Sequence, residues 1–103
     1  MTKENQQTAH NTFFMKKKTA FIINPISGTT KKDLIPAYIL DTLNEDIFDA
    51  EIVFTERKGH GSELARSFVA RGFDIVVAVG GDGTVNEIAR ELRHTNTALG
   101  IIP

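Results

Sequence analysis

Hydrophobic residues along this chain fall into two alternating patterns. Short apolar runs rich in β-branched residues are typical of buried strands, and they occupy residues 19–24, 50–55, 74–79 and 99–102. Between these runs, apolar residues recur at intervals of three and four, which is the spacing of one helix face. The resulting βαβαβαβ order predicts an α/β fold with a doubly wound, mainly parallel sheet in three layers. The third run is the most hydrophobic, so we expect it at the centre of the sheet.

The first predicted helix has a start signal and a clear apolar face. Asp33 can cap its amino end, and Ile35, Ile39 and Leu43 recur at four-residue spacing. Counted from that cap, Pro36 falls in the first turn, where its missing N–H has no intrahelical partner to lose. The proline therefore does not interrupt the helix.

The other two predicted helices follow polar loops that contain glycine. One begins at Ser62 and ends before Gly72, which stands where a left-handed C-terminal cap belongs. The other begins at Thr84, because Thr84 and Glu87 have the spacing of a capping box. Their apolar stripes consist of Leu64, Ala65, Phe68 and Val69 in the first and of Val85, Ile88, Ala89 and Leu92 in the second.

The length of 103 residues and the hydrophobic content of 41% suit one small packed domain. Residues 1–12 are polar and without periodicity, so we expect a flexible N-terminal tail over residues 1–17 and a domain at residues 18–103. Phe13, Phe14 and Met15 depart from this pattern. We expect them to pack on the domain edge, and peripheral contact with a membrane surface is the alternative.

Charge and cysteine content exclude several classes of protein. The formal charge is -1, so no overall positive field favours nucleic acid as a partner. Cysteine is absent, which excludes disulfides, thiolate metal sites and cysteine nucleophiles and suits the reducing cytoplasm, the location we expect. The lysines at residues 16–18 precede too short an apolar stretch for a signal peptide, and no segment is long enough to span a membrane.

Polar loops follow the first three predicted strands. They cover residues 25–32, 56–61 and 80–84, and the carboxyl ends of parallel strands share one edge of the sheet, where ligands of this fold class bind. Four cationic residues lie in or beside these loops, namely Lys31, Lys32, Arg57 and Lys58. This distribution favours an anionic ligand at that edge.

The loop after the third strand carries the strongest chemical signal. Gly80 to Glu87 reads Gly-Gly-Asp-Gly-Thr-Val-Asn-Glu between a strand and a helix. Its glycines let backbone N–H groups approach an anion, and the helix amino end adds unpaired donors, so we expect it to bind phosphate. It is not a dinucleotide fingerprint, because Asn86 occupies the third glycine position, and the chain lacks the Gly-Lys-Ser/Thr of a Walker A loop. Asn24-Pro25 after the first strand also lacks the acidic residues of a phospho-acceptor domain.

Three motifs at the strand ends together resemble a known family. They are Asn-Pro-Ile-Ser-Gly at residues 24–28, Thr55 with Gly59-His60 behind it, and Gly80 to Glu87. In this order they resemble the diacylglycerol kinase catalytic domain family, which includes bacterial diacylglycerol and related lipid kinases and the eukaryotic sphingosine and ceramide kinases. The glycine motif alone also resembles NAD kinases and, in shorter form, 6-phosphofructokinases. The Asn-Pro-x-Ser-Gly and Val-Asn-Glu segments favour the lipid kinases.

The resemblance implies a Rossmann-like nucleotide-binding half-domain and ATP-dependent phosphorylation of a lipid hydroxyl, with ATP and Mg2+ as cofactors. It implies that Asp82 is catalytic, either as the acceptor of the lipid hydroxyl proton or as a group that orients Mg2+ through water. No residue is expected to bind the metal directly. The residues implied to line the ATP site are Asn24, Pro25, Ile26, Ser27, Gly28, Thr55, Gly80, Gly81, Asp82, Gly83, Thr84, Val85, Asn86 and Glu87.

The resemblance also implies that residues 18–103 are an N-terminal ATP-binding subdomain. Family members continue into a β-rich domain that helps to form the lipid pocket, so we expect this chain alone to be inactive. Apolar surface on residues 99–102 is expected to favour homo-oligomers. An NAD kinase-like or sugar-phosphate kinase-like protein and a non-catalytic nucleotide-binding or assembly module stay open as alternatives. His60 is expected to face solvent in a loop, and no histidine is assigned a role.

Overall fold

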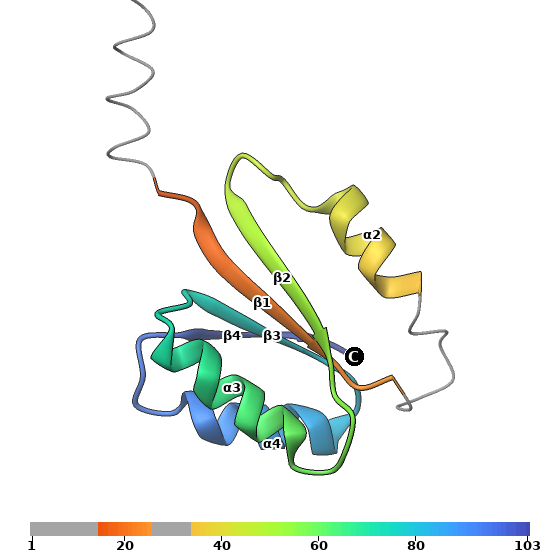
Figure 1. Cartoon of the computed structure of the whole chain (residues 1–103), viewed down its shortest axis with the longest axis vertical. Helices are drawn as coiled ribbons and strands as arrows, with labels where there is room; N and C mark the ends of the chain where they lie inside the picture. Colours follow the sequence, from red (N-terminus) through yellow and green to blue (C-terminus); the bar gives the residue numbers. More distant parts are fainter. Residues whose placement is uncertain (1–14, 26–33) are drawn as a thin grey trace, which may run out of the picture.

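The structure is a computed structural model that describes residues 15–25 and 34–103, and it confirms the predicted α/β fold with a parallel sheet between helices (Figure 1). The sheet consists of β1 (Lys17–Ile23), β2 (Phe48–Phe54), β3 (Ile75–Val79) and β4 (Ala98–Ile102). The described helices are α2 (Ile35–Thr42), α3 (His60–Ala70) and α4 (Asp82–Leu92). Most of the expected tail and most of the loop after β1 lie outside the described residues.

All four strands run parallel in the order β2-β1-β3-β4. The chain therefore moves outward from β1 to β2 and then returns to β3 on the other side of β1. This reversal creates a switch point between β1 and β3, the place where sheets of this kind bind ligands. Figure 1 shows the carboxyl ends of the strands converging beside the first turns of α3 and α4. As its hydrophobicity predicts, β3 is an inner strand.

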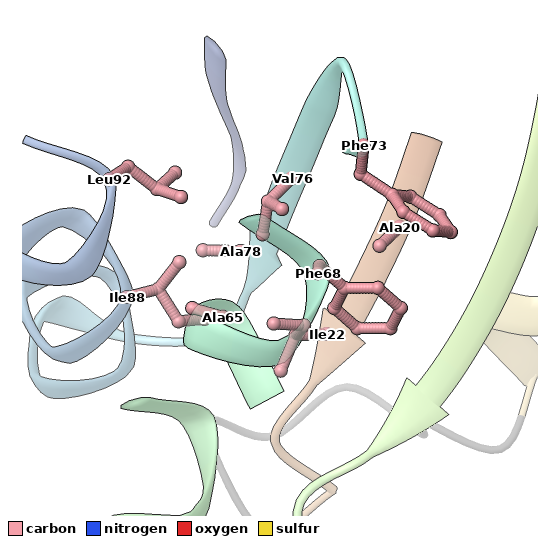
Figure 2. Close-up of a cluster of buried hydrophobic side chains, with 9 residues drawn as sticks. All are labelled: Ala20, Ile22, Ala65, Phe68, Phe73, Val76, Ala78, Ile88 and Leu92. Carbon is pink, nitrogen blue, oxygen red and sulfur yellow. The ribbon is translucent and has the colours of Figure 1, made fainter. Parts of the chain in front are cut away.

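One apolar layer lies between the sheet and the helices α3 and α4 (Figure 2). Even-numbered residues of β1 and β3 face it, because successive strand residues point to opposite sides of a sheet. The rings of Phe68 and Phe73 have centroids 4.8 Å apart, and the guanidinium of Arg71 lies 5.2 Å and 4.9 Å from these two centroids. The buried members of this layer are Ala20, Ile22, Ala65, Phe68, Phe73, Val76, Ala78, Ile88 and Leu92.

The opposite face of the sheet packs against α2. Ile35, Ile39 and Leu43 all contribute to this second layer, which confirms the predicted apolar face of the first helix. Pro36 lies in the first turn, as expected, but the N-cap position belongs to Leu34 instead of Asp33, which lies outside the described residues. With helices on both faces of the sheet, the predicted three layers are present. Within the described part of the chain, no helix combines the length and the apolar character needed to cross a bilayer.

The start of α3 differs from the prediction. The helix begins at His60, two residues before Ser62, and its N-cap is Gly59 with a left-handed φ of +84°. His60 is half-buried, and its Nδ1 accepts a hydrogen bond from the backbone N–H of Glu56 (2.9 Å), so the expectation of a solvent-facing loop histidine is wrong. Gly72 follows the helix at φ +77°, the predicted left-handed conformation.

The start of α4 also differs from the prediction. The helix begins at Asp82 with Gly81 as its N-cap, and no side chain of the described residues caps it. The capping box predicted for Thr84 and Glu87 is therefore wrong, because both residues lie inside α4. The side chain of Thr84 instead accepts a hydrogen bond from Asn24, and that of Glu87 accepts one from Ser62 of α3.

Candidate functional site

Asn24 joins the two loops that leave β1 and β3 at the switch point. Its backbone N–H donates to the carbonyl of Val79 (3.0 Å), and its Nδ2 donates to Oγ1 of Thr84 (3.0 Å). Pro25 disfavours a helical conformation for the residue before it, which suits the extended end of β1. Because Thr84 lies in the first turn of α4, one amide side chain ties the end of β1 to the start of α4.

The turn between β3 and α4 requires glycine at its first position. Gly80 is buried at φ +158°, and a Cβ there would lie 3.0 Å from Oγ1 of Thr84. The first N–H groups of the helix that follows have no intrahelical acceptor and carry the positive end of the helix dipole. A Cβ on Gly83 would meet no described atom within 4 Å, so the outer side of this turn is open to a ligand.

A cleft of about 650 Å³ opens beside this turn. Small-molecule sites commonly enclose roughly 300–1,000 Å³, so its size suits a nucleotide. The turn, the loops after β1 and β2, and one face of α4 contribute its walls. The described residues that line it are Asn24, Pro25, Thr55, Glu56, Arg57, Lys58, Gly61, Gly81, Gly83, Thr84, Asn86, Glu87 and Arg90.

Some of the residues implied for the ATP site line the cleft, and others do not. Gly80 is buried behind the turn, and Val85 packs against the core under α4, so neither lines the cleft. Asp82 is exposed at the first position of α4, between Gly81 and Gly83, which line the cleft. Residues 26–28 lie outside the described residues. The implied residues on the cleft wall are Asn24, Pro25, Thr55, Gly81, Gly83, Thr84, Asn86 and Glu87.

Comparison with known proteins identifies the family. The sequence model of the diacylglycerol kinase catalytic domain matches residues 18–103. The chain belongs to this family. A diacylglycerol kinase from Staphylococcus haemolyticus is 33% identical over 91 residues, which cover 86% of this chain and 28% of that protein. The diacylglycerol kinase of Bacillus subtilis is 33% identical over 91 residues, which cover 84% of this chain and 29% of that protein.

A solved structure of a diacylglycerol kinase from Bacillus anthracis has the same fold. It superposes with a TM-score of 0.67 at 26% sequence identity, over 86% of this chain and 33% of that one. The chain thus spans about 30% of the length of the curated diacylglycerol kinases that it matches.

In this diacylglycerol kinase family chain, the loop after β2 forms the wall that faces the glycine turn. The N–H of Thr55 donates to the carbonyl of Ile23 (2.8 Å), which continues the β1–β2 pairing and places Thr55 at the carboxyl edge. Arg57 donates two hydrogen bonds to the carboxylate of Glu63 (2.6 Å and 2.9 Å). This bond raises the pKa of Arg57 and lowers the pKa of Glu63. The loop is therefore anchored to α3 by its own arginine.

Arg90 is a cleft residue that the sequence motifs did not reveal. It lies on α4 one turn beyond Asn86 and two turns beyond Gly83, and all three line the cleft. Lys58 lines it from the loop after β2. Neither Lys58 nor Arg90 forms an ion pair with a carboxylate in the described part of the chain. Both cations are therefore available to an anionic ligand, and only the four- and seven-residue spacing along α4 could have indicated Arg90.

Ser62 connects α3 to α4 beside the cleft. Its backbone N–H donates to Oε1 of Glu87 (2.9 Å), and its Oγ donates to Oε2 of Glu91 (2.5 Å). Arg66 adds an ion pair to Glu91, with Nη1 3.2 Å from Oε2. The hydrogen bond from Ser62, supported by the charge of Arg66, lowers the pKa of Glu91.

The described residues do not form a protein cage for a metal ion. Across residues 15–25 and 34–103, no three His, Asp or Glu side chains come together in a way that could hold one. Mg2+ usually keeps several waters in nucleotide sites and binds one or two carboxylates together with the phosphates. The exposed carboxylate of Asp82 within the glycine turn suits that mode.

Proposed function

We propose that this chain forms the ATP-binding part of a lipid kinase, which phosphorylates a hydroxyl of diacylglycerol or a related lipid. The observation that carries the proposal is the cleft at the β1–β3 switch point, where the glycine turn is bonded through Thr84 to Asn24. The relatives named diacylglycerol kinase support the choice of reaction.

The first turn of α4 would hold the phosphates of ATP. The backbone N–H groups from Gly81 to Thr84 are donors at the positive end of the helix, and the open side of Gly83 allows a phosphate to approach. Thr55 offers a hydroxyl from the facing wall, and Lys58 adds positive charge there. In our proposal Ile26, Ser27 and Gly28 complete the phosphate site, with Ser27 as a second hydroxyl.

Asp82 would act on the transferred group. Mg2+ bound with ATP supplies charge neutralisation for the phosphoryl group. The carboxylate of Asp82 would either hold a water of that ion or accept the proton of the attacking lipid hydroxyl. Its exposure at the start of α4 leaves it accessible for both roles.

We propose that residues 18–103 form the N-terminal ATP-binding subdomain and that a second, β-rich domain supplies the lipid wall of the cleft. The curated relatives extend well beyond the region that this chain matches, which supports a second unit in the family. Because the proposed substrate is a membrane lipid, we propose that the protein works at a membrane surface. The exposed Met15 beside the lysines at residues 16–18 is the described segment suited to that contact.

Transfer of labelled phosphate from ATP and Mg2+ to a panel of lipids tests the proposal. The protein is assayed alone and as a fusion with the segment that follows the matched region in the Bacillus subtilis diacylglycerol kinase, with that intact enzyme as positive control. We expect label on diacylglycerol or a related lipid from the fusion. Label on NAD, or no labelled lipid from a folded fusion that binds ATP, would contradict the proposal.

Removing the cation on α4 is expected to weaken nucleotide binding. Arg90→Gln should raise the Kd for ATP about tenfold, because one charged partner of the anion is lost from the cleft. Arg93→Gln is the matched control, since Arg93 caps the same helix without lining the cleft. Calorimetric titration with ATP and Mg2+ measures the Kd of both variants. Equal losses of affinity would show that the net charge of the protein matters and that Arg90 does not contact the nucleotide.

The exposed edge at β4 is expected to promote self-association. Leu99 and Ile101 remain 38% and 53% exposed, and β4 has no strand on its outer side among the described residues. An open edge with apolar side chains can pair with another chain. Sedimentation should therefore show dimers as protein concentration rises, and Ile101→Lys should reduce them. A clean monomer at high concentration would contradict this prediction.

A further inference from the structure

We propose that Glu87 is a positioning residue that sets the separation of the two walls of the cleft, and that it does so by capping α3 from α4. This inference deepens the proposed nucleotide site, on which it rests. Glu87 was implied as a contact of ATP and as a cap of its own helix. In the structure Glu87 lines the cleft, and its Oε1 accepts a hydrogen bond from the backbone N–H of Ser62, at a distance of 2.9 Å.

Helix α3 lacks a side-chain cap of its own. Its N-cap is Gly59, which has no side chain to accept a hydrogen bond from the first turn. The first N–H groups of a helix need acceptors from elsewhere, and a carboxylate is favoured there by the helix dipole. Glu87 supplies that carboxylate from the neighbouring helix. The amino end of α3 is therefore held by a residue of the glycine-turn helix.

The close approach of Glu87 to α3 depends on Gly61. A Cβ at Gly61 would lie 2.9 Å from Oε1 of Glu87, closer than real Cβ contacts, whereas its next neighbour, Cγ1 of Ile88, would be at an ordinary 3.5 Å. The clash involves the flexible end of a side chain, so it can be relieved by moving the carboxylate away. A methyl group at residue 61 would thus displace Glu87 without disturbing the core.

The contact between Ser62 and Glu87 lies at the wall of the cleft. Gly61 and Glu87 both line the cleft, and Gly61 follows the loop that carries Thr55 and Lys58 on the facing wall. That loop is tied to the first turns of α3 through His60 and Glu63. The Ser62–Glu87 contact therefore fixes the loop wall relative to the glycine turn, and its loss should misplace the groups that face the nucleotide.

The test combines five variants with two kinds of readout. Gly61→Ala and Glu87→Ala should each raise the Kd for ATP with Mg2+ about tenfold and speed hydrogen exchange of the Ser62 amide measured without nucleotide. The double variant should lose no more than either single one, because both remove the same contact. Glu87→Gln, which keeps an oxygen acceptor, should recover most of the affinity. Glu91→Ala is the matched control. The substitution removes another hydrogen-bond acceptor of Ser62, but Glu91 does not line the cleft, so the Kd for ATP should stay unchanged.

The outcomes separate a positioning role from a merely structural one. Losses in affinity that multiply in the double variant, or an equal loss in Glu91→Ala, would overturn the proposal. Should Glu87→Ala fail to fold, Gly61→Ala carries the same test, because alanine is preferred to glycine in a helix. Should the unaltered protein not bind ATP, the proposed function fails, whereas Ser62 exchange still decides whether Glu87 and Gly61 hold the two helices together.

Discussion

Asp82→Asn is expected to abolish nearly all phosphate transfer while leaving nucleotide binding intact. The turnover number for lipid phosphorylation by the fusion with the Bacillus subtilis segment should fall about 10³-fold, the usual scale for loss of a general acid–base group. The Kd for ATP should change little, because the phosphates are expected to be held by the backbone N–H groups of the turn, which the substitution retains.

The control for this variant is Asp49→Asn, which removes an exposed carboxylate from β2 away from the cleft. It should leave turnover unchanged. Repeating the Asp82→Asn assay at raised Mg2+ distinguishes the two proposed roles, since extra metal restores activity only if the carboxylate positions the ion. Full turnover of Asp82→Asn at ordinary Mg2+ would remove Asp82 from the chemistry.

Gly80→Ala is expected to give the largest loss of stability among single changes in the glycine turn. A side chain at φ +158° is strained, and its Cβ would lie 3.0 Å from Oγ1 of Thr84, which accepts the hydrogen bond from Asn24. Strain and the lost hydrogen bond together should lower the free energy of unfolding by about 3 kcal/mol. Urea unfolding followed by circular dichroism measures this change.

Gly72→Ala provides the matched comparison. Gly72 also has positive φ, but a Cβ there meets no described atom within 4 Å, so only backbone strain applies. Its cost should be about 1 kcal/mol. Equal losses of unfolding free energy in the two variants would mean that a side chain at Gly80 causes no destabilising contact with Thr84.

The strands and the apolar helix faces could be predicted because burial dictates them locally. Ile22 and Val76 belong to continuous apolar runs, and Ile35, Ile39 and Leu43 repeat at helical spacing, so the sequence pattern alone indicates which faces are covered. The edge of the site was also predictable, since the carboxyl ends of parallel strands must share one edge. Thr55 and the glycine turn meet there as parts of one cleft.

The helix starts could not be predicted, because partners distant in the sequence satisfy them. Thr84 and Glu87 have capping-box spacing, yet Thr84 bonds to Asn24, sixty positions earlier, and Glu87 bonds to Ser62. A local motif cannot indicate such bonds before the strand order is known. Arg90 could not be predicted for the same reason. A single arginine can be assigned to the site only once its helix face is known to line the cleft.

Titration of the protein with ATP and Mg2+, followed by backbone amide chemical shifts, tests whether the glycine turn binds the phosphates of ATP. We expect saturable shifts concentrated at Gly81 to Thr84, with smaller ones at Asn24 and Thr55 and none along α2, which packs on the other face of the sheet. No saturable shift in the glycine turn, or shifts confined to surfaces away from the cleft, would contradict this expectation.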